Sequence, residues 1–176
     1  MGMSARRSFW FAAKGVVLGL GAGLALFLAG CEQEKPPPIP PYVLSRTVEG
    51  DFDEVLTNVK DALGRKNFPV TNVRDYRKSL LERYAQVGGG TLPFHRYNIV
   101  EGCNLELAQS ALRTDPGIGV FLPCRVVIFQ KEENGPIKVM AVNPAVMPWA
   151  LNNPALGTVA EQVAEAMDEA LKTADF

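Results

Sequence analysis

Apolar positions follow two spacings from Tyr42 onward. Short runs rich in β-branched and aromatic residues predict strands, at 42–48, 68–73, 95–100, 124–130 and 137–142. Apolar residues three and four positions apart predict helices, from 51 to about 65–67, at 105–113, at 158–172 and, less regularly, at 75–86. The order βαβ(α)βαββα predicts an α+β domain, a two-layer fold with helices packed on a mostly antiparallel sheet.

Local signals place the ends of several elements. Asp51 and Glu54 have the Asp-x-x-Glu form of a capping box ahead of the first helix. Pro69 lacks a backbone N–H, so the strand at 68–73 is expected at an edge of the sheet. The 133–136 stretch, Glu-Asn-Gly-Pro, predicts a hairpin between the last two strands, and the 115–117 stretch, Asp-Pro-Gly, predicts a turn.

The first thirty residues follow neither pattern. Arg6 and Arg7 precede an apolar run from 15 to 30, which ends in small residues. That run contains five glycines and is shorter than the roughly 20 residues that span a bilayer. A removable signal peptide over residues 1–30 is therefore favoured over a permanent transmembrane helix.

The end of that run, Leu28-Ala29-Gly30-Cys31, resembles the lipobox of bacterial lipoproteins. The resemblance implies that Cys31 receives a thioether-linked diacylglycerol, that the chain is cut before it, and that the new amine is acylated. Burial of acyl chains contributes about 0.8 kcal/mol per CH₂, so several chains form a lasting anchor in the lipid bilayer. The predicted location is the cell envelope, lipid-anchored and facing the periplasm or the outer cell surface. The alternative is an ordinary secretory peptide with a cysteine near its cleavage site.

Arg6-Arg7 followed by Phe9 also resembles the twin-arginine export signal, although Ala5 and Trp10 depart from that pattern. This route would imply export of an already folded domain. Use of the general secretory route is the alternative.

After the cysteine, residues 36–41 contain five prolines in six positions. Such a stretch favours an extended polyproline II spacer of about 3.1 Å per residue. A proline-rich ligand for an aromatic groove of a partner is the alternative. The predicted organisation is a signal peptide at 1–30, a lipidated cysteine and tether at 31–41, and one domain at 42–176.

Charge narrows the class of partner. Removing Arg6, Arg7 and Lys14 from the 18 basic residues leaves 15 against 19 acidic residues, a net charge of about −4 for the mature protein. No basic stripe remains to neutralise phosphates, so nucleic acid is not an expected partner.

Two short motifs, at 101–104 (Glu-Gly-Cys-Asn) and 122–124 (Leu-Pro-Cys), with Asp115-Pro116 between them, resemble the domain of unknown function 302 family. The resemblance covers roughly residues 44–171. It implies a small two-layer α/β fold, frequent pairing into dimers, and no established activity. Leu105 stands where many members have proline, and the segment 75–93 is longer than usual.

Once Cys31 is lipidated, Cys103 and Cys124 are the two remaining cysteines of the chain. Cys103 precedes a predicted helix, whose N–H groups favour a thiolate. A structural disulfide between the two is the default in an oxidising compartment, and it would stabilise the fold by roughly 3 kcal/mol. A redox-active pair and a metal or haem site are the alternatives.

Other soft side chains give little support for a metal. Met140 and Met147 are expected in the core, and His95 at the surface or a strand edge. With one histidine there is no His–His spacing for zinc and no Cys-x-x-Cys-His motif for haem. The glycines at 88–90 are not followed by the residues of a phosphate loop. No metal, cofactor or catalytic residue is therefore predicted, and catalysis is disfavoured.

Two functional classes are compatible with these patterns. The favoured class is a membrane-tethered binding or accessory domain that presents a groove or dimer face to a small ligand or protein partner, a homodimer included. The alternative is a thiol-dependent redox or metal/haem-handling protein that uses Cys103 and Cys124. A count of free thiols on the non-reduced protein separates the two.

Overall fold

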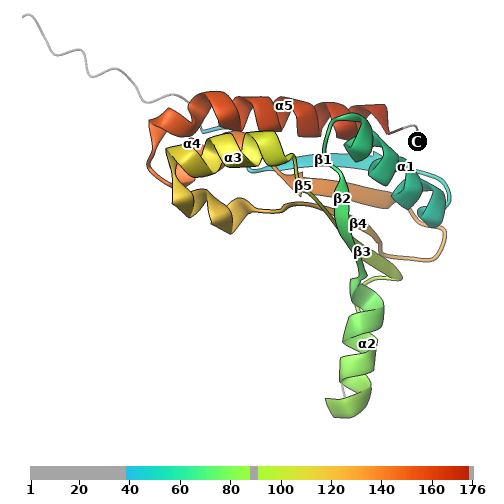
Figure 1. Ribbon diagram of the computed structural model, residues 1–176. Helices are drawn as coiled ribbons and strands as arrows, with labels where there is room; N and C mark the ends of the chain where they lie inside the picture. Colours follow the sequence, from blue (N-terminus) through green and yellow to red (C-terminus); the bar gives the residue numbers. More distant parts are fainter. Residues whose placement is uncertain (1–38, 88–90, 175–176) are drawn as a thin grey trace, which may run out of the picture. The chain divides into compact units, whose positions relative to one another are not determined.

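The computed structural model describes residues 39–87 and 91–174 (Figure 1). The expectations for Arg6, Arg7 and Cys31 fall outside the described residues. The elements run in the order β1 (Val43–Val48), α1 (Phe52–Arg65), β2 (Val70–Asp75), α2 (Tyr76–Val87), β3 (Arg96–Gly102), α3 (Leu105–Thr114), η1 (Pro116–Phe121), β4 (Cys124–Gln130), β5 (Ile137–Val142), η2 (Pro144–Val146), α4 (Met147–Ala150), η3 (Pro154–Leu156) and α5 (Gly157–Thr173).

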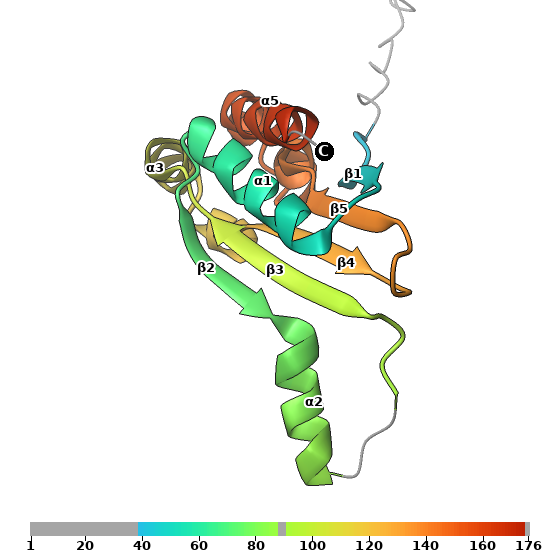
Figure 2. The ribbon, with the colours of Figure 1, turned by 90° about the vertical axis from the view of Figure 1, so that its right-hand side faces the viewer.

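The five strands form one sheet in the order β1-β5-β4-β3-β2, and every neighbouring pair is antiparallel. Helices α1, α3 and α5 lie on one face of this sheet (Figures 1 and 2). The predicted two-layer α+β fold is confirmed. β2 pairs only with β3 and forms an edge, as Pro69 at its start predicted.

Capping explains where the first helices begin. Asp51 accepts hydrogen bonds of 2.9 Å from the N–H groups of both Asp53 and Glu54, and α1 starts directly after it. Asn104 accepts a bond of 3.1 Å from the N–H of Leu107 at the start of α3. Each bond satisfies an N–H that has no partner inside its own helix.

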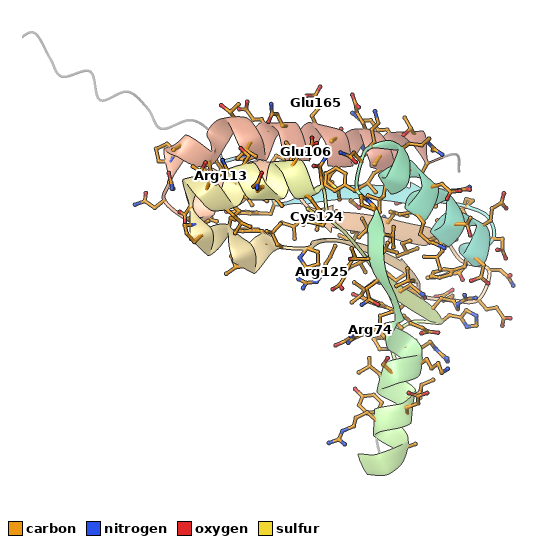
Figure 3. All side chains as sticks on the ribbon, viewed as in Figure 1. Arg74, Glu106, Arg113, Cys124, Arg125 and Glu165 are labelled. Carbon is orange, nitrogen blue, oxygen red and sulfur yellow. The ribbon has the colours of Figure 1, made fainter. Side chains whose placement is uncertain are left out.

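The core lies between the helices and the face of the sheet that they cover. Val100, Ile128 and Val139 from the three central strands are fully buried there. The inner stripe of α5 contains Val159, Ala160, Val163, Met167, Ala170 and Leu171. Ala166, between two of these buried residues, is only half-buried. Glu106, Arg113 and Glu165 lie on the exposed sides of α3 and α5 (Figure 3).

Helix α2 confirms the least regular helical prediction, and it projects away from the sheet (Figures 1 and 2). Its first ring, Tyr76, lies 5.9 Å from Tyr97 of β3, measured between ring centroids. Every α2 side chain described, from Tyr76 to Ala85, is exposed or half-buried. This helix is therefore held mainly at its first turn.

The connection from β5 to α5 was not predicted, and it contains the short helices η2, α4 and η3. Two of them begin in the same way: Asn143 and Asn153 accept hydrogen bonds of 3.1 Å from Ala145 and Ala155. In each case proline fills the first helical position, where its missing N–H costs nothing. The expected turn after Asp115 is likewise a short 3-10 helix, η1.

Asn143 also fixes the start of the domain. Its side-chain Nδ2 donates to the carbonyl of Pro41, and its backbone N–H donates to the carbonyl of Tyr42, both at 2.8 Å. Asn143 is buried, so these bonds are shielded from water.

Among the described residues, no helix is both long enough and apolar enough to cross a bilayer.

Candidate functional site

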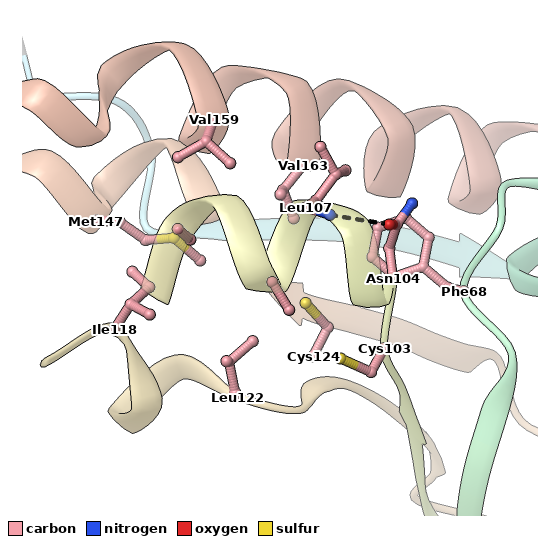
Figure 4. A pocket seen from close by; sticks show the side chains of 12 residues that line it. Phe68, Cys103, Asn104, Leu107, Ile118, Leu122, Cys124, Met147, Val159 and Val163 are labelled. Carbon is pink, nitrogen blue, oxygen red and sulfur yellow. Dashed lines mark hydrogen bonds between the residues drawn. The ribbon is translucent and has the colours of Figure 1, made fainter. Parts of the chain in front are cut away.

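The two domain cysteines lie at the same end of the sheet. Cys124 is the first residue of β4 and pairs with Gly102, and Cys103 directly follows Gly102. Both side chains lie beneath the start of α3 (Figure 4). Both thiols are free and half-buried, so the predicted disulfide is not formed in this structure.

The residues on either side of Cys103, Gly102 and Asn104, each have a structural role. A Cβ on Gly102 would lie 3.2 Å from the carbonyl oxygen of Phe68 and 3.5 Å from that of Pro69. Only glycine lets the chain leading into β2 pass this close. The N–H of Cys103 donates to Pro69 at 3.3 Å, and Asn104 then caps α3.

Burial raises the pKa of both thiols. The pKa of Cys103 rises because burial disfavours the thiolate. The pKa of Cys124 rises to about 11, first through burial and second through the neighbouring Cys103. The pKa of Cys103 thus shifts in the direction opposite to the one expected from its position before α3, because burial disfavours the charged form. Redox-active cysteines have lowered pKa values, unlike this pair.

The hollow beside these thiols is small. It offers an inner space of about 20 Å³, which suffices for about one water molecule. Its apolar lining includes Leu107, Ile118 and Met147. Figure 4 shows Met147 beside Ile118, at the other end of the hollow from the cysteines. This inner space is far smaller than a typical ligand site.

The other predicted soft side chains lie elsewhere. Met147 is buried in the core, as expected. Met140 is on the opposite face of the sheet, which corrects its predicted core position. His95 precedes β3, and its backbone N–H donates to Gln130 at 2.8 Å. In residues 39–87 and 91–174, no three His, Cys, Asp or Glu side chains gather as a metal site would require.

The face of the sheet opposite α1, α3 and α5 is apolar at its centre. Ile99, Val127 and Met140 pair in register across β3, β4 and β5, and Tyr97 pairs with Phe129 in the next row. All five side chains are half-buried. We call this surface the uncovered face, because none of the helices that the structure describes packs over its centre (Figures 1 and 2). The solvent-facing side of an antiparallel sheet is normally polar, so the apolar band at the centre of this face departs from the usual pattern.

Two hollows lie on the uncovered face, and both have the size of ligand sites. One measures about 380 Å³ beside the β4–β5 hairpin and is lined by Ser45, Phe129, Lys131, Glu132, Pro136, Lys138 and Met140. The other measures about 330 Å³ beside β2 and is lined by Asn72, Arg74, Tyr76, Ile99, Glu101 and Arg125.

Charged groups lie at the β2 end of this face. Arg125 donates to Glu101 at 3.0 Å, and Asn72 donates to the other Glu101 oxygen at 3.1 Å. The bond from Arg125, followed by that from Asn72, lowers the pKa of Glu101. Arg74 adds a second guanidinium to the same hollow (Figure 3). Glu101 opens the motif at 101–104, but no motif links it to Asn72, Arg74 or Arg125, and only the pairing of β2, β3 and β4 brings these residues together.

Comparison with known proteins places this geometry in a family. A curated protein of Aquifex aeolicus (strain VF5), named "Uncharacterized protein", is 30% identical over 97 residues, which are 54% of this chain and 56% of that protein. The match thus spans just over half the length of this relative. The crystal structure of an uncharacterized conserved protein DUF302 from Bacillus stearothermophilus is similar in fold, with a TM-score of 0.64 and 22% identity. That similarity covers 76% of this chain and 98% of the other.

The family match extends from β1 to the end of α5, at residues 44–174. It includes the cysteine motifs, both layers of the fold and the whole uncovered face. The chain therefore belongs to the family described as domain of unknown function DUF302.

Proposed function

We propose that this protein is a lipid-anchored protein of the cell envelope whose domain binds a partner through the uncovered face. The observation that carries the binding role is the apolar band of Ile99, Val127 and Met140, with Tyr97 and Phe129 beside it. Burial of such a band contributes roughly 25 cal/mol for each Å² of apolar surface removed from water. A surface of this kind favours association over catalysis.

The anchor is supported by the sequence of the first 31 residues. Arg6 and Arg7, an apolar run and the lipobox-like Leu28-Ala29-Gly30-Cys31 occur in the order that lipoprotein signals require. In this proposal the acylated Cys31 holds the protein in a membrane, with the domain facing the periplasm or the outer cell surface.

A second copy of the chain is the partner we propose for the uncovered face. In a twofold interface the same surface of each copy packs against itself. The uncovered face suits this arrangement, because its centre is apolar and its ends carry charges of both signs. The end beside β2 carries Arg74 and Arg125 against one carboxylate, Glu101. The hairpin end carries Lys131, Lys138 and Glu132. A small ligand in either hollow is the competing occupant.

The oligomeric state tests this assignment. We expect the mature domain to form a dimer in sedimentation experiments and the Val127→Glu variant to be monomeric, because a charge placed between Ile99 and Met140, at the centre of a buried apolar interface, is costly to bury. Leu112→Glu, on the exposed side of α3, is the matched control and should stay dimeric. A wild-type monomer that binds nothing through this face would contradict the proposed binding role.

Acylation tests the anchor separately. We expect metabolic labelling with a radioactive fatty acid to mark the wild type and not Cys31→Ser, whereas Cys103→Ser should still be labelled. An unlabelled, soluble wild type would overturn the lipoprotein proposal. Replacement of Arg6 and Arg7 by lysine should stop export if the twin-arginine route is used, because lysine keeps the charge and loses the guanidinium geometry.

A structural disulfide between Cys103 and Cys124 is a second, independent proposal. The pairing of Gly102 with Cys124 brings Cys103 to the same end of the sheet as Cys124, and both line one hollow, which favours this bond. The oxidising compartment that the anchor implies favours it too. The raised pKa values of both thiols speak against the redox or metal/haem-handling alternative.

A further inference from the structure

Exposed apolar side chains gather where the chain enters the domain. Of the eleven large hydrophobic side chains that are exposed in the described part of the chain, five lie there: Ile39, Tyr42, Val43, Val142 and Trp149. We call these five residues the tether pole. Its two aromatic side chains are each more than half exposed, Tyr42 at 53% and Trp149 at 55%.

Contacts hold four of these residues together as one surface. The rings of Tyr42 and Trp149 meet edge to face, with centroids 5.8 Å apart. Val43 pairs with Val142 across β1 and β5. Asn143 joins the two pairs, because it follows Val142 and its N–H donates to the carbonyl of Tyr42. These four residues of the tether pole therefore form a fixed surface rather than a set of scattered side chains.

The sequence around the tether pole carries no charge. Residues 36–45 and 139–160 contain no Asp, Glu, Lys, Arg or His. Tyrosine and tryptophan combine an apolar ring with a polar O–H or N–H group, and both are enriched at membrane–water interfaces. A neutral aromatic surface of this kind suits the headgroup level rather than the hydrocarbon interior.

The tether pole is also the part of the domain closest along the chain to the proposed anchor. Ile39 follows Cys31 by eight residues, and a fully extended chain of this length reaches at most about 28 Å. This length is the largest distance that the tether allows between Ile39 and the membrane, and the domain can also lie closer. The exposed side chains of the domain determine how close it lies.

We propose that the tether pole rests on the phospholipid bilayer at headgroup level and orients the domain on the membrane. This inference depends on the proposed lipid anchor. Several acyl chains alone hold a protein in a membrane, so the tether pole adds orientation rather than retention. The domain then stands on the β1–β5 edge of its sheet and on α4, with α2 at the opposite edge.

The emission of Trp149 tests this contact directly. The chain has two tryptophans, Trp10 and Trp149, and cleavage before Cys31 leaves Trp149 alone. The acylated wild type is placed in phosphatidylcholine vesicles with and without bromine on the acyl chains near the headgroup. We expect brominated lipid to quench most of the Trp149 emission and the vesicles to protect Trp149 from acrylamide.

A matched control moves the tryptophan to the other edge of the sheet. In the double variant Trp149→Tyr and Tyr84→Trp, the only tryptophan lies on α2, and its emission should be the same in both kinds of vesicle. Circular dichroism checks that the variant is folded. If it is not, Tyr76→Trp in the same Trp149→Tyr background serves as the control.

The outcomes separate the tether pole from the anchor. Acylated wild type that floats with the vesicles but keeps its full emission in brominated lipid overturns the tether pole alone. The same holds if Trp149 is shielded from acrylamide without any quenching by bromine, because a protein partner then covers it. A wild type without acyl chains that stays in the aqueous phase overturns the anchor and the tether pole together.

Discussion

The two faces of β4 are nearly equal in sequence and unlike in structure. Val126 and Ile128 point to the helices and are 1% and 0% exposed, whereas Val127 and Phe129, between and after them, are half-buried on the uncovered face. Apolar side chains on the first face stabilise the fold, because they lose all contact with water. Those on the second face keep surface that a partner can bury. Comparison of the two faces therefore separates the part of the sheet used for folding from the part available for association.

The largest expected effect is in the core. Ile128→Ala should lower the free energy of unfolding by about 2 to 5 kcal/mol, through lost transfer energy and the cavity left behind. Urea denaturation of the domain measures this loss in the free energy of unfolding. Val126→Ala and Val127→Ala form a matched pair of variants. Each removes the same methyl groups, the first from the face of β4 that the helices cover and the second from the uncovered face. Equal losses for the two valines in a monomeric protein would break the distinction between the faces.

The proposed disulfide comes next. If Cys103 and Cys124 are bonded, replacing either by serine should lower the free energy of unfolding by about 2 to 5 kcal/mol, and the double variant should be no worse than the worse single one. A peptide map of the non-reduced protein should show the two cysteine peptides joined.

Both thiols are protonated at neutral pH when reduced, so slow labelling of the folded protein proves nothing about a bond. The protein is therefore unfolded without reductant in the presence of an alkylating agent. Two alkylated cysteines in a never-reduced sample would disprove the disulfide.

A smaller effect is expected at the start of α3. Asn104→Ala removes the oxygen that accepts the Leu107 N–H at 3.1 Å, and loss of such a cap costs about 1 kcal/mol. Asn104→Ser keeps an accepting oxygen and should recover most of that loss. Urea denaturation of both variants decides the matter, and equal losses for alanine and serine would show that the cap is not the cause.

The smallest effect is expected for the ion pair on the uncovered face. Glu101→Gln should lower stability by less than about 1 kcal/mol at pH 7, because Arg125 is half exposed at 50%. The folded-state pKa of Glu101 is lowered, so the charged form stabilises the fold above the ordinary carboxyl pKa of about 4.3. This contribution disappears as the pH falls through the lowered value. A loss of several kcal/mol at pH 7, unchanged in acid, would contradict this account.

Much of the fold follows from local sequence signals. Asp51 and the spacing of apolar residues after it predict α1, and the Asn-Gly pair predicts the hairpin, because both act through hydrogen bonds and backbone angles within a few residues. Asn134 indeed adopts a positive φ of 60° in that hairpin. The β5–α5 connection was missed, although its repeated Asn-Pro pairs at 143 and 153 are a cap signal.

The uncovered face could not be predicted. β4 contains the continuous apolar run 126–129 and β5 the run 139–142, and such runs do not tell which face a helix covers. Met140 was assigned to the core for this reason. The pKa of Cys103 was misjudged because position before a helix is visible in a sequence, whereas burial depends on packing that forms only in the fold.

The attachment of the tether to an edge strand also determines how the domain responds to force. A pull on an anchor at Cys31 would reach Pro41 and Tyr42 first, where Asn143 holds both by bonds of 2.8 Å. Behind them, β1 pairs with β5 starting at Val43. A load from the anchor would therefore act on these two hydrogen bonds of Asn143 before it reaches the β1–β5 pairs.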